Sequence, residues 1–219
     1  MKHIQRQIEL LKQKILNVGG LVEEAIANAI SAMLNRDGKL AQRVIGDDSV
    51  IDQMEVEVEE DCLKILALYQ PVAADLRFVV AILKINNDLE RIGDLARNIA
   101  KRVNYLSKSD PIELPFSLRE MTTKVQSMVK LSLDALVNGD VSLARHVREE
   151  DDIVDNERKK IADHIISLIK KMPERVEYLL KLNSVSKHLE RIADMATNIA
   201  EDVIYMVEGE IVRHKLKDG

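Results

Sequence analysis

One twelve-residue motif occurs twice in this chain, and the repeat constrains the fold more than any other feature. Residues 89–100 read LERIGDLARNIA and residues 189–200 read LERIADMATNIA, with nine identities in twelve positions. The similarity continues upstream, where residues 31–52 align with residues 134–155. A duplication of this extent predicts two structural units of about 100 residues each, the size of a small domain.

The composition predicts that both units are helical. The chain is 46% hydrophobic and 32% charged, with eight Gly and four Pro in 219 residues, so helix-breaking residues are scarce. The net charge of −5 argues against a nucleic-acid-binding module and against direct binding of free anions. The single cysteine, Cys62, excludes an intrachain disulfide, and we expect it to be a small apolar residue in a reducing compartment.

No segment of the sequence is long and apolar enough to span a membrane. The run FVVAILKI at residues 78–85 is far shorter than the roughly 20 residues that a spanning helix needs. The first residues, KHIQRQIELLKQK, are amphipathic and do not resemble a signal peptide. We therefore expect a soluble, cytoplasmic protein that reaches a membrane only through a partner or through its surface.

Six long segments have the 3.6-residue periodicity of amphipathic helices, and each ends at a helix-breaking segment such as Gln70-Pro71. They cover residues 2–35, 38–69, 73–106, 115–137, 140–171 and 174–208. The segment between Pro111 and Pro115 has the composition of a linker and separates the two repeats. The pattern predicts an all-α fold of two antiparallel three-helix bundles in tandem, residues 1–108 and 109–219.

Acidic side chains lie on the outer faces of these expected helices. On the third helix, Glu90, Asp94 and Asn98 fall opposite the apolar stripe when residues are placed 100° apart. On the second helix, four acids share one stripe: Asp48, Asp52, Glu55 and Glu59. We therefore expect both groups of carboxylates on the outside of the first bundle.

The hairpin between the second and third helices determines which acids meet. Asp52 and Glu90 each lie 19 residues from Pro71, and Asp48 and Asp94 each lie 23 residues from it. Because both helices rise about 1.5 Å per residue, the members of each pair are level. In the second repeat, counted from Pro173, the acids that fall level to within one residue are Asp155 with Glu190 and Asp151 with Asp194.

Carboxylates held this close repel one another, so their pKa values rise or they recruit a cation. A divalent or trivalent metal bound by carboxylate oxygens removes the conflict, with Asn98 or Asn198 as an amide ligand or a hydrogen-bonding neighbour. The alternative is that the acids form solvated faces balanced by Lys and Arg, with Arg91 and Arg191 each paired to a neighbouring helix.

The two acidic faces are not equivalent in sequence. Glu55 and Glu59 of the first repeat align with Arg158 and Ala162 of the second. We therefore expect the second site to bind metal more weakly or to hold fewer ions.

The chain resembles the PhoU family of phosphate-signalling proteins in both twelve-residue motifs, in QPVAADLR at residues 70–77 and in VEGEIVRH at residues 207–214. The resemblance covers essentially the whole chain. It implies two three-helix bundles that carry multinuclear clusters of iron or another metal on their acidic faces. Carried over by position, the ligands are Asp48, Asp52, Glu90, Asp94, Asp151, Asp155, Glu190 and Asp194.

The same resemblance implies a cytoplasmic negative regulator of phosphate uptake. Such a protein restrains the phosphate ABC importer and helps hold a sensor histidine kinase in its phosphate-replete, non-signalling state. The implied partner contacts include Asp75 and Arg77, and we add Arg91 and Arg191 from the repeated motif. A homodimer is also expected, from apolar residues near Val80 and Leu83 that we take to be exposed.

Catalytic motifs are missing from the sequence. No histidine follows a glutamate by three residues, and no phosphate-binding loop, zinc-protease motif or nucleophile elbow occurs. We expect the protein not to be an enzyme, and His146, His164 and His188 to be structural or solvated. The alternative function is metal storage or scavenging, although the sequence encodes no cage for many ions.

Overall fold

The computed structural model describes residues 2–212, and six long α-helices account for most of them. Their bounds are Lys2–Asn35 (α1), Gly38–Tyr69 (α2), Ala73–Leu106 (α3), Phe116–Asn138 (α4), Val141–Lys171 (α5) and Val176–Glu208 (α6). The six predicted segments are confirmed to within two residues at each end. The largest difference precedes α6, where Pro173–Arg175 forms a short 3-10 helix. His214, the last residue of the VEGEIVRH motif, lies outside the described residues.

Local capping explains why the helices begin and end where they do. The Asp37 side chain accepts hydrogen bonds from the backbone N–H groups of Lys39 and Leu40, and so caps α2. Asp140 caps α5 in the same way, by accepting from the N–H of Leu143. Gly139, with φ of 62°, ends α4 in the left-handed conformation that glycine adopts without strain. The short connections that result force consecutive helices to pack antiparallel.

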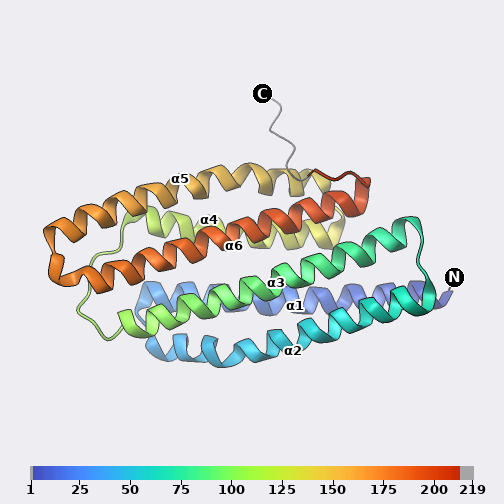
Figure 1. The fold of residues 1–219 in the computed structure, drawn as a ribbon, viewed down its shortest axis with the longest axis horizontal. Helices are drawn as coiled ribbons and strands as arrows, with labels where there is room; N and C mark the ends of the chain where they lie inside the picture. The colour runs from blue at the N-terminus through green and yellow to red at the C-terminus, as the bar shows by residue number, and fades with distance from the viewer. Residues whose placement is uncertain (1, 213–219) are drawn as a thin grey trace.

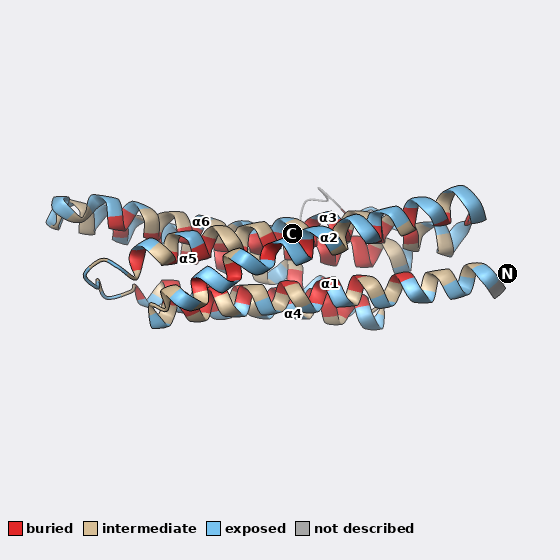
Figure 2. Cartoon of the chain, turned by 90° about the horizontal axis from the view of Figure 1, so that it is seen from below, coloured by how far each residue is buried: buried red, intermediate tan, exposed pale blue. Residues whose placement is uncertain are grey.

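The helices form two layers (Figures 1 and 2). The order across the face seen in Figure 1 is α2, α3, α6 and α5, while α1 and α4 form the layer behind. Helices α1–α3 make one bundle and α4–α6 the other, and α3 packs against α6 where the bundles meet. The predicted all-α fold of two tandem three-helix bundles is therefore confirmed.

One apolar core runs through both bundles. Buried side chains from all six long helices belong to a single cluster, including Leu89 and Ile92 of α3 and their counterparts Leu189 and Ile192 of α6. Buried residues face the space between the two layers in Figure 2. The two repeats therefore stabilise each other through a shared core, because separating them would expose apolar surface.

Two expectations for apolar residues have different outcomes. Cys62 is fully buried, and burial raises the pKa of its thiol to about 12, so it behaves as the small apolar residue we expected. The expectation that Val80 and Leu83 are exposed is wrong, because both are half-buried and Leu83 packs against the core. The homodimer that rested on their exposure stays a prediction. Between residues 2 and 212, no helix has the length and apolar character to cross a membrane.

Candidate metal centre and central groove

The first acidic face contains an arginine whose pairing with two of the acids the sequence analysis did not predict. Arg97 of α3 donates to Asp48 of α2 and to Asp94 of its own helix, so one guanidinium joins the two carboxylates. Asp48 is only 5% exposed, which corrects our expectation that its carboxylate lies on the outside of the bundle. Burial raises the pKa of Asp48, the charge of Arg97 partly offsets that rise, and Asp52 and Asp94 add to it.

The remaining acids of this face lie close enough to repel one another. Burial is the main cause that raises the pKa of Glu90, and the charges of Asp94, Asp52 and Glu55 raise it further. The pKa of Glu55 is likewise raised, by burial first and then by Glu59 and Asp52. The predicted juxtaposition of Asp52 with Glu90 and of Asp48 with Asp94 is thus present in the structure.

Asn86 is a polar neighbour of this face that the sequence analysis missed. It is almost fully buried, and its Nδ2 donates to the backbone oxygen of Glu55 at 2.8 Å and to Glu55 Oε1 at 3.3 Å. Its Oδ1 has no hydrogen-bond partner among the described residues. Asn86 lies one helical turn before Glu90, and that spacing was the available signal.

The second acidic face lacks the arginine that joins the acids of the first. Thr197 stands at the position of Arg97. The pKa of the Asp194 carboxyl is raised to about 6, mainly by partial burial and further by the charges of Asp151, Asp155 and Glu190. The residue still keeps part of its surface exposed to solvent. The four predicted acids of this repeat are therefore brought together as well.

Arginines of α5 partly neutralise this second face. Arg158 Nε lies 3.5 Å from Glu190 Oε2, and Arg148 Nε lies 3.2 Å from Glu201 Oε1. Arg158 is the residue that replaces Glu55 of the first repeat, so the expected substitution does place a cation among the acids. Weaker metal binding at this face stays a prediction.

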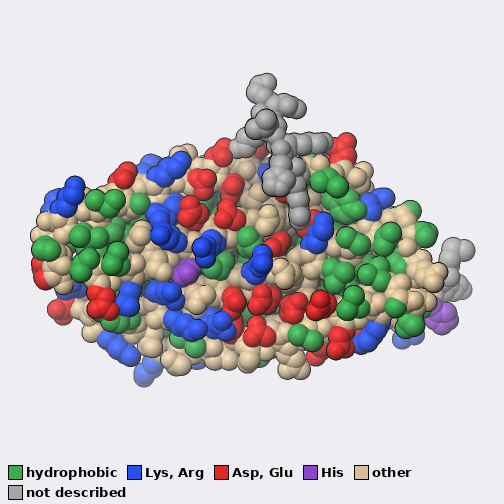
Figure 3. All heavy atoms as spheres, in the orientation of Figure 1, with side chains coloured by type: hydrophobic (Ala, Val, Ile, Leu, Met, Phe, Trp, Pro, Cys, Tyr) green, Lys and Arg blue, Asp and Glu red, His purple; other side chains and the backbone are tan. Residues whose placement is uncertain are grey.

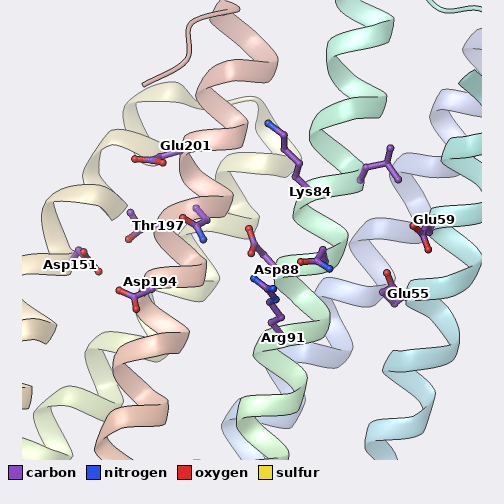
Figure 4. Close-up of a pocket in the computed structure, with 12 residues that line it drawn as sticks. Glu55, Glu59, Lys84, Asp88, Arg91, Asp151, Asp194, Thr197 and Glu201 are labelled. Atoms are coloured by element: carbon purple, nitrogen blue, oxygen red, sulfur yellow. The ribbon is translucent and has the colours of Figure 1, made fainter. Parts of the chain in front are cut away.

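A groove of about 860 Å³ lies between the two acidic faces (Figure 4). Glu55 and Glu59 of α2 line one side, and Asp151 of α5 and Asp194 of α6 line the other. Lys84, Asp88 and Arg91 project from α3 between these walls. Figure 3 shows the result on the surface, where two groups of Asp and Glu side chains flank a strip that contains Lys and Arg.

The two predicted amide ligands differ in position. Asn198 lines the groove together with Asp151 and Asp194, while its Nδ2 lies 3.9 Å from the sulfur of Met195. Asn98 is half-buried on α3, and its backbone oxygen accepts from Arg102 Nη1 at 3.2 Å. A role for either amide toward a metal stays a prediction.

The expected partner residues do not form one cluster. Asp75 lies in the first turn of α3 and accepts from Gln5 Nε2 at 3.2 Å, while Arg77 Nε lies 3.5 Å from the backbone oxygen of Met206. Arg91 and Arg191 are exposed near the middle of the α3–α6 face. Arg191 lies within electrostatic reach of Asp194 on its own helix. The alternative that each arginine pairs with a neighbouring helix stays a prediction.

His188 lies at the edge of the core, as we expected. It is half-buried, and its Nε2 lies 3.3 Å from Ser184 Oγ. Burial lowers the pKa of the imidazole to about 4, and the charges of Arg102 and Arg191 lower it further. The ring is therefore neutral at physiological pH, and it lies within electrostatic reach of both guanidiniums.

As the side chains lie, no three His, Cys, Asp or Glu residues in the described part of the chain converge as a metal site. Arg97 and Arg158 stand among the carboxylates that would otherwise approach one another. The donor chemistry still suits a cation that prefers oxygen ligands, because acids of an adjacent helix raise the pKa of Glu90 on the first face and of Asp194 on the second. The ligand set and the iron clusters stay predictions.

These features define a class of protein: an all-helical tandem repeat with carboxylates gathered on two faces and one apolar core shared by both bundles. The comparison with protein families agrees with this class. The PhoU domain model matches residues 15–103 and 118–203, one copy for each bundle. The chain belongs to the PhoU family.

Known relatives match over nearly the whole chain. A phosphate-specific transport system accessory protein PhoU homolog from Aquifex aeolicus is 38% identical over 210 residues, which cover 96% of this chain and 95% of that protein. The crystal structure of PhoU from Pseudomonas aeruginosa matches with a TM-score of 0.91 at 37% identity, covering 94% of this chain and 99% of that one. The phosphate transport system regulatory protein PhoU from Streptococcus pneumoniae has a TM-score of 0.88 at 32% identity, with 95% and 99% covered.

Proposed function

We propose that this protein is an accessory and regulatory protein of a phosphate-specific transport system. The observation that carries the proposal is the match of both repeats, over 96% of the chain, to a protein of that role. In finer form, the protein acts in the cytoplasm as an adaptor between the phosphate ABC importer and a sensor histidine kinase. It restrains uptake and keeps the kinase in its non-signalling state when phosphate is plentiful.

The surface supports an adaptor rather than an enzyme. The groove lies open on a face of long helices that share one core, so a partner meets a preformed surface. Arg91 and Arg191 are exposed on this face, so their guanidiniums can contact acidic groups of a partner.

The adaptor role is tested in cells that lack the gene. We expect deletion to switch on a phosphate-starvation reporter in phosphate-rich medium, and the wild-type gene to switch it off again. An Arg91→Glu/Arg191→Glu double variant should fail to restore repression, because the reversed charges repel an acidic partner. Lys64→Glu, a single charge reversal on the outer face of α2, is the control and should restore it. A deletion strain with normal reporter activity and normal phosphate uptake would overturn the proposal.

We also propose that metal ions, iron or another divalent ion in multinuclear clusters, bind at the acidic faces. On the first face, Arg97 engages Asp48 and Asp94. Glu55 and Glu90 both lie within electrostatic reach of Asp52, so these three acids are the best placed to hold a cation. On the second face, Asp151 and Asp194 line the groove. A bound cation would supply the positive charge that offsets the mutual repulsion of the carboxylates.

Elemental analysis of protein purified without a chelator or an affinity tag tests this proposal. We expect two or more ions per chain, with separate losses in Glu90→Ala and Asp194→Ala and the smaller loss in the second. If the protein carries no metal and folds normally, the alternative holds and the acidic faces are solvated surface. Many ions per chain would instead favour the alternative function of metal storage.

A further inference from the structure

The duplication places equivalent residues at the two ends of the seam between α3 and α6, and these residues differ in charge. At one end, Lys84 Nζ lies 3.3 Å from Asp202 Oδ1. At the other end, the positions 100 residues away hold Ser184 in place of Lys84 and Arg102 in place of Asp202. The first end thus contains a cation with its carboxylate, and the second contains a cation with a hydroxyl.

Arg102 keeps unused donors and lacks a counter-ion. Its Nε lies 3.3 Å from Ser184 Oγ, and its Nη1 donates to the backbone oxygen of Asn98 at 3.2 Å. In the part of the chain from residue 2 to residue 212, Arg102 forms no ion pair. A guanidinium carries five N–H donors, so two bonds leave most of this one for a ligand.

The surroundings of Arg102 add to the positive charge. A shallow hollow of about 370 Å³ is lined by Lys101, Arg102, Lys181 and Ser184, with Glu177 as its one acid. Glu177 lies 3.5 Å from Lys181 and offsets only one of the three cations. Figure 3 shows Lys and Arg side chains gathered over this part of the face. The net charge of −5, which argued against anion binding, is a property of the whole chain. An anion responds to the local charge, which is positive at this end of the seam.

We propose that Arg102 and Ser184 bind inorganic phosphate, which serves as the counter-ion of Arg102 as the Asp202 carboxylate does for Lys84 at the other end. The planar guanidinium matches two phosphate oxygens at once, and the serine hydroxyl can donate to a third. Lys101 and Lys181 balance the remaining charge of a dianion. The choice of phosphate over other oxyanions rests on the proposed function in phosphate transport, whereas the anion site itself rests on the geometry.

This site needs no metal, so it differs from a site at which phosphate would bind to metal ions held by the acidic faces. Calorimetric titration with inorganic phosphate is done on the full-length protein as purified and again after treatment with a chelator. We expect the same affinity in both samples. Arg102→Gln should weaken binding by about tenfold or more, because it removes a charge-assisted pair of hydrogen bonds.

A second variant tests the geometry of the site. Ser184→Asp places a carboxylate beside Arg102, so an internal ion pair should occupy the guanidinium and abolish phosphate binding. Lys64→Gln removes the same unit of charge from α2, far from the hollow, and should leave the affinity unchanged. Circular dichroism checks that each variant is folded, and both seam variants change half-exposed residues.

Three results would overturn the inference: unchanged affinity in both seam variants, binding that disappears with the metal, or equal affinity for sulfate. Binding of glycerol 3-phosphate well above that of inorganic phosphate would also overturn it and assign the site to a phosphomonoester. The titration is independent of the reporter assay. Phosphate binding together with a normal reporter in deleted cells would sink the proposed function and leave the site standing.

Discussion

The two repeats carry the same carboxylates but surround them with different cations. In the first repeat, Arg97 joins Asp48 to Asp94 within the bundle. In the second, Thr197 stands at that position, and Arg158 of α5 reaches Glu190 instead. The first repeat thus has an arginine at the level of Asp48 and Asp94, whereas the second has one at the level of Asp155 and Glu190.

This difference shows how one motif can give two electrostatic states. The first face balances its most buried carboxylate, Asp48, with a guanidinium that is itself only 29% exposed. On the second face the pKa of Asp194 rises to about 6 through burial and through neighbouring acids, with only a partial offset from Arg191. Identity of the acids alone therefore does not make the two sites equivalent. The predictions below test this contrast.

The largest effect is expected from copying the second repeat into the first by Arg97→Thr. The change leaves Asp48 buried without its counter-ion, which should lower the free energy of unfolding by about 3 kcal/mol at neutral pH. The loss should shrink as the pH falls, because the pKa of Asp48 is already raised and protonation removes the buried charge. Urea denaturation at several pH values, in the presence of a chelator, measures both effects.

A second substitution provides the control for that result. Asp48→Asn in the Arg97→Thr background should recover most of the lost stability, because the buried group is then neutral. If Arg97→Thr changes stability by no more than an exposed salt bridge would, Asp48 does not depend on this arginine and the contrast between the repeats is weaker than we describe.

A smaller effect, of opposite sign in the two repeats, is expected from neutralising the equivalent aspartates. Asp194→Asn should raise the free energy of unfolding by about 1 kcal/mol at neutral pH, after allowance for solvent screening at its exposed side chain. Asp94→Asn should lower it by about 0.5 kcal/mol, because Arg97 loses one partner. Thermal and urea denaturation of metal-free protein compare the two variants. Equal signs would contradict the prediction.

The pH dependence of the Asp194 variant follows from the direction of the shift. The folded pKa, about 6, lies above the ordinary value of 3.8, so the ionised carboxylate destabilises the folded state. That penalty is complete above about pH 7 and disappears as the pH falls through 6 toward 4. Wild type and Asp194→Asn should therefore converge in stability at acidic pH.

The smallest effect concerns a matched exchange of size in the core. A Cβ added to Gly93 would lie 3.1 Å from Ile51 Cδ1, whereas the second repeat has Ala193 and the smaller Val154 at these positions. Gly93→Ala gains helix propensity but crowds Ile51. Adding Ile51→Val should relieve the crowding, with an interaction energy of roughly 0.5–1 kcal/mol in a double-mutant cycle. If the effects of the two substitutions on the free energy of unfolding simply add, the Ile51 side chain can shift to accommodate the new Cβ without loss of stability.

Sequence periodicity predicted the helices and the heights of the acids closely. Asp52 with Glu90 and Asp48 with Asp94 meet because both helices rise equally from the turn at Pro71. The burial of Asp48 could not be predicted in this way, since it depends on how far the Arg97 side chain reaches across to the next helix.

The groove was also beyond the sequence argument. Helical periodicity identifies the face that each helix turns toward its own bundle, but the packing of α3 on α6 joins two bundles through residues that no local pattern singles out. Lys84 and Asp202 are 118 residues apart in the chain, and only the tertiary structure brings them together.

The antiparallel packing of α3 on α6 makes the protein comparable to a symmetric dimer fused into one chain. In a dimer of identical subunits, every contact across the two-fold axis occurs twice, so both ends of such a seam must carry the same charge. Fusion removes that restriction: Lys84 with Asp202 at one end can coexist with Ser184 and Arg102 at the other. The two ends of the seam therefore differ in charge. A partner that recognises this difference binds in one orientation, with one copy per chain.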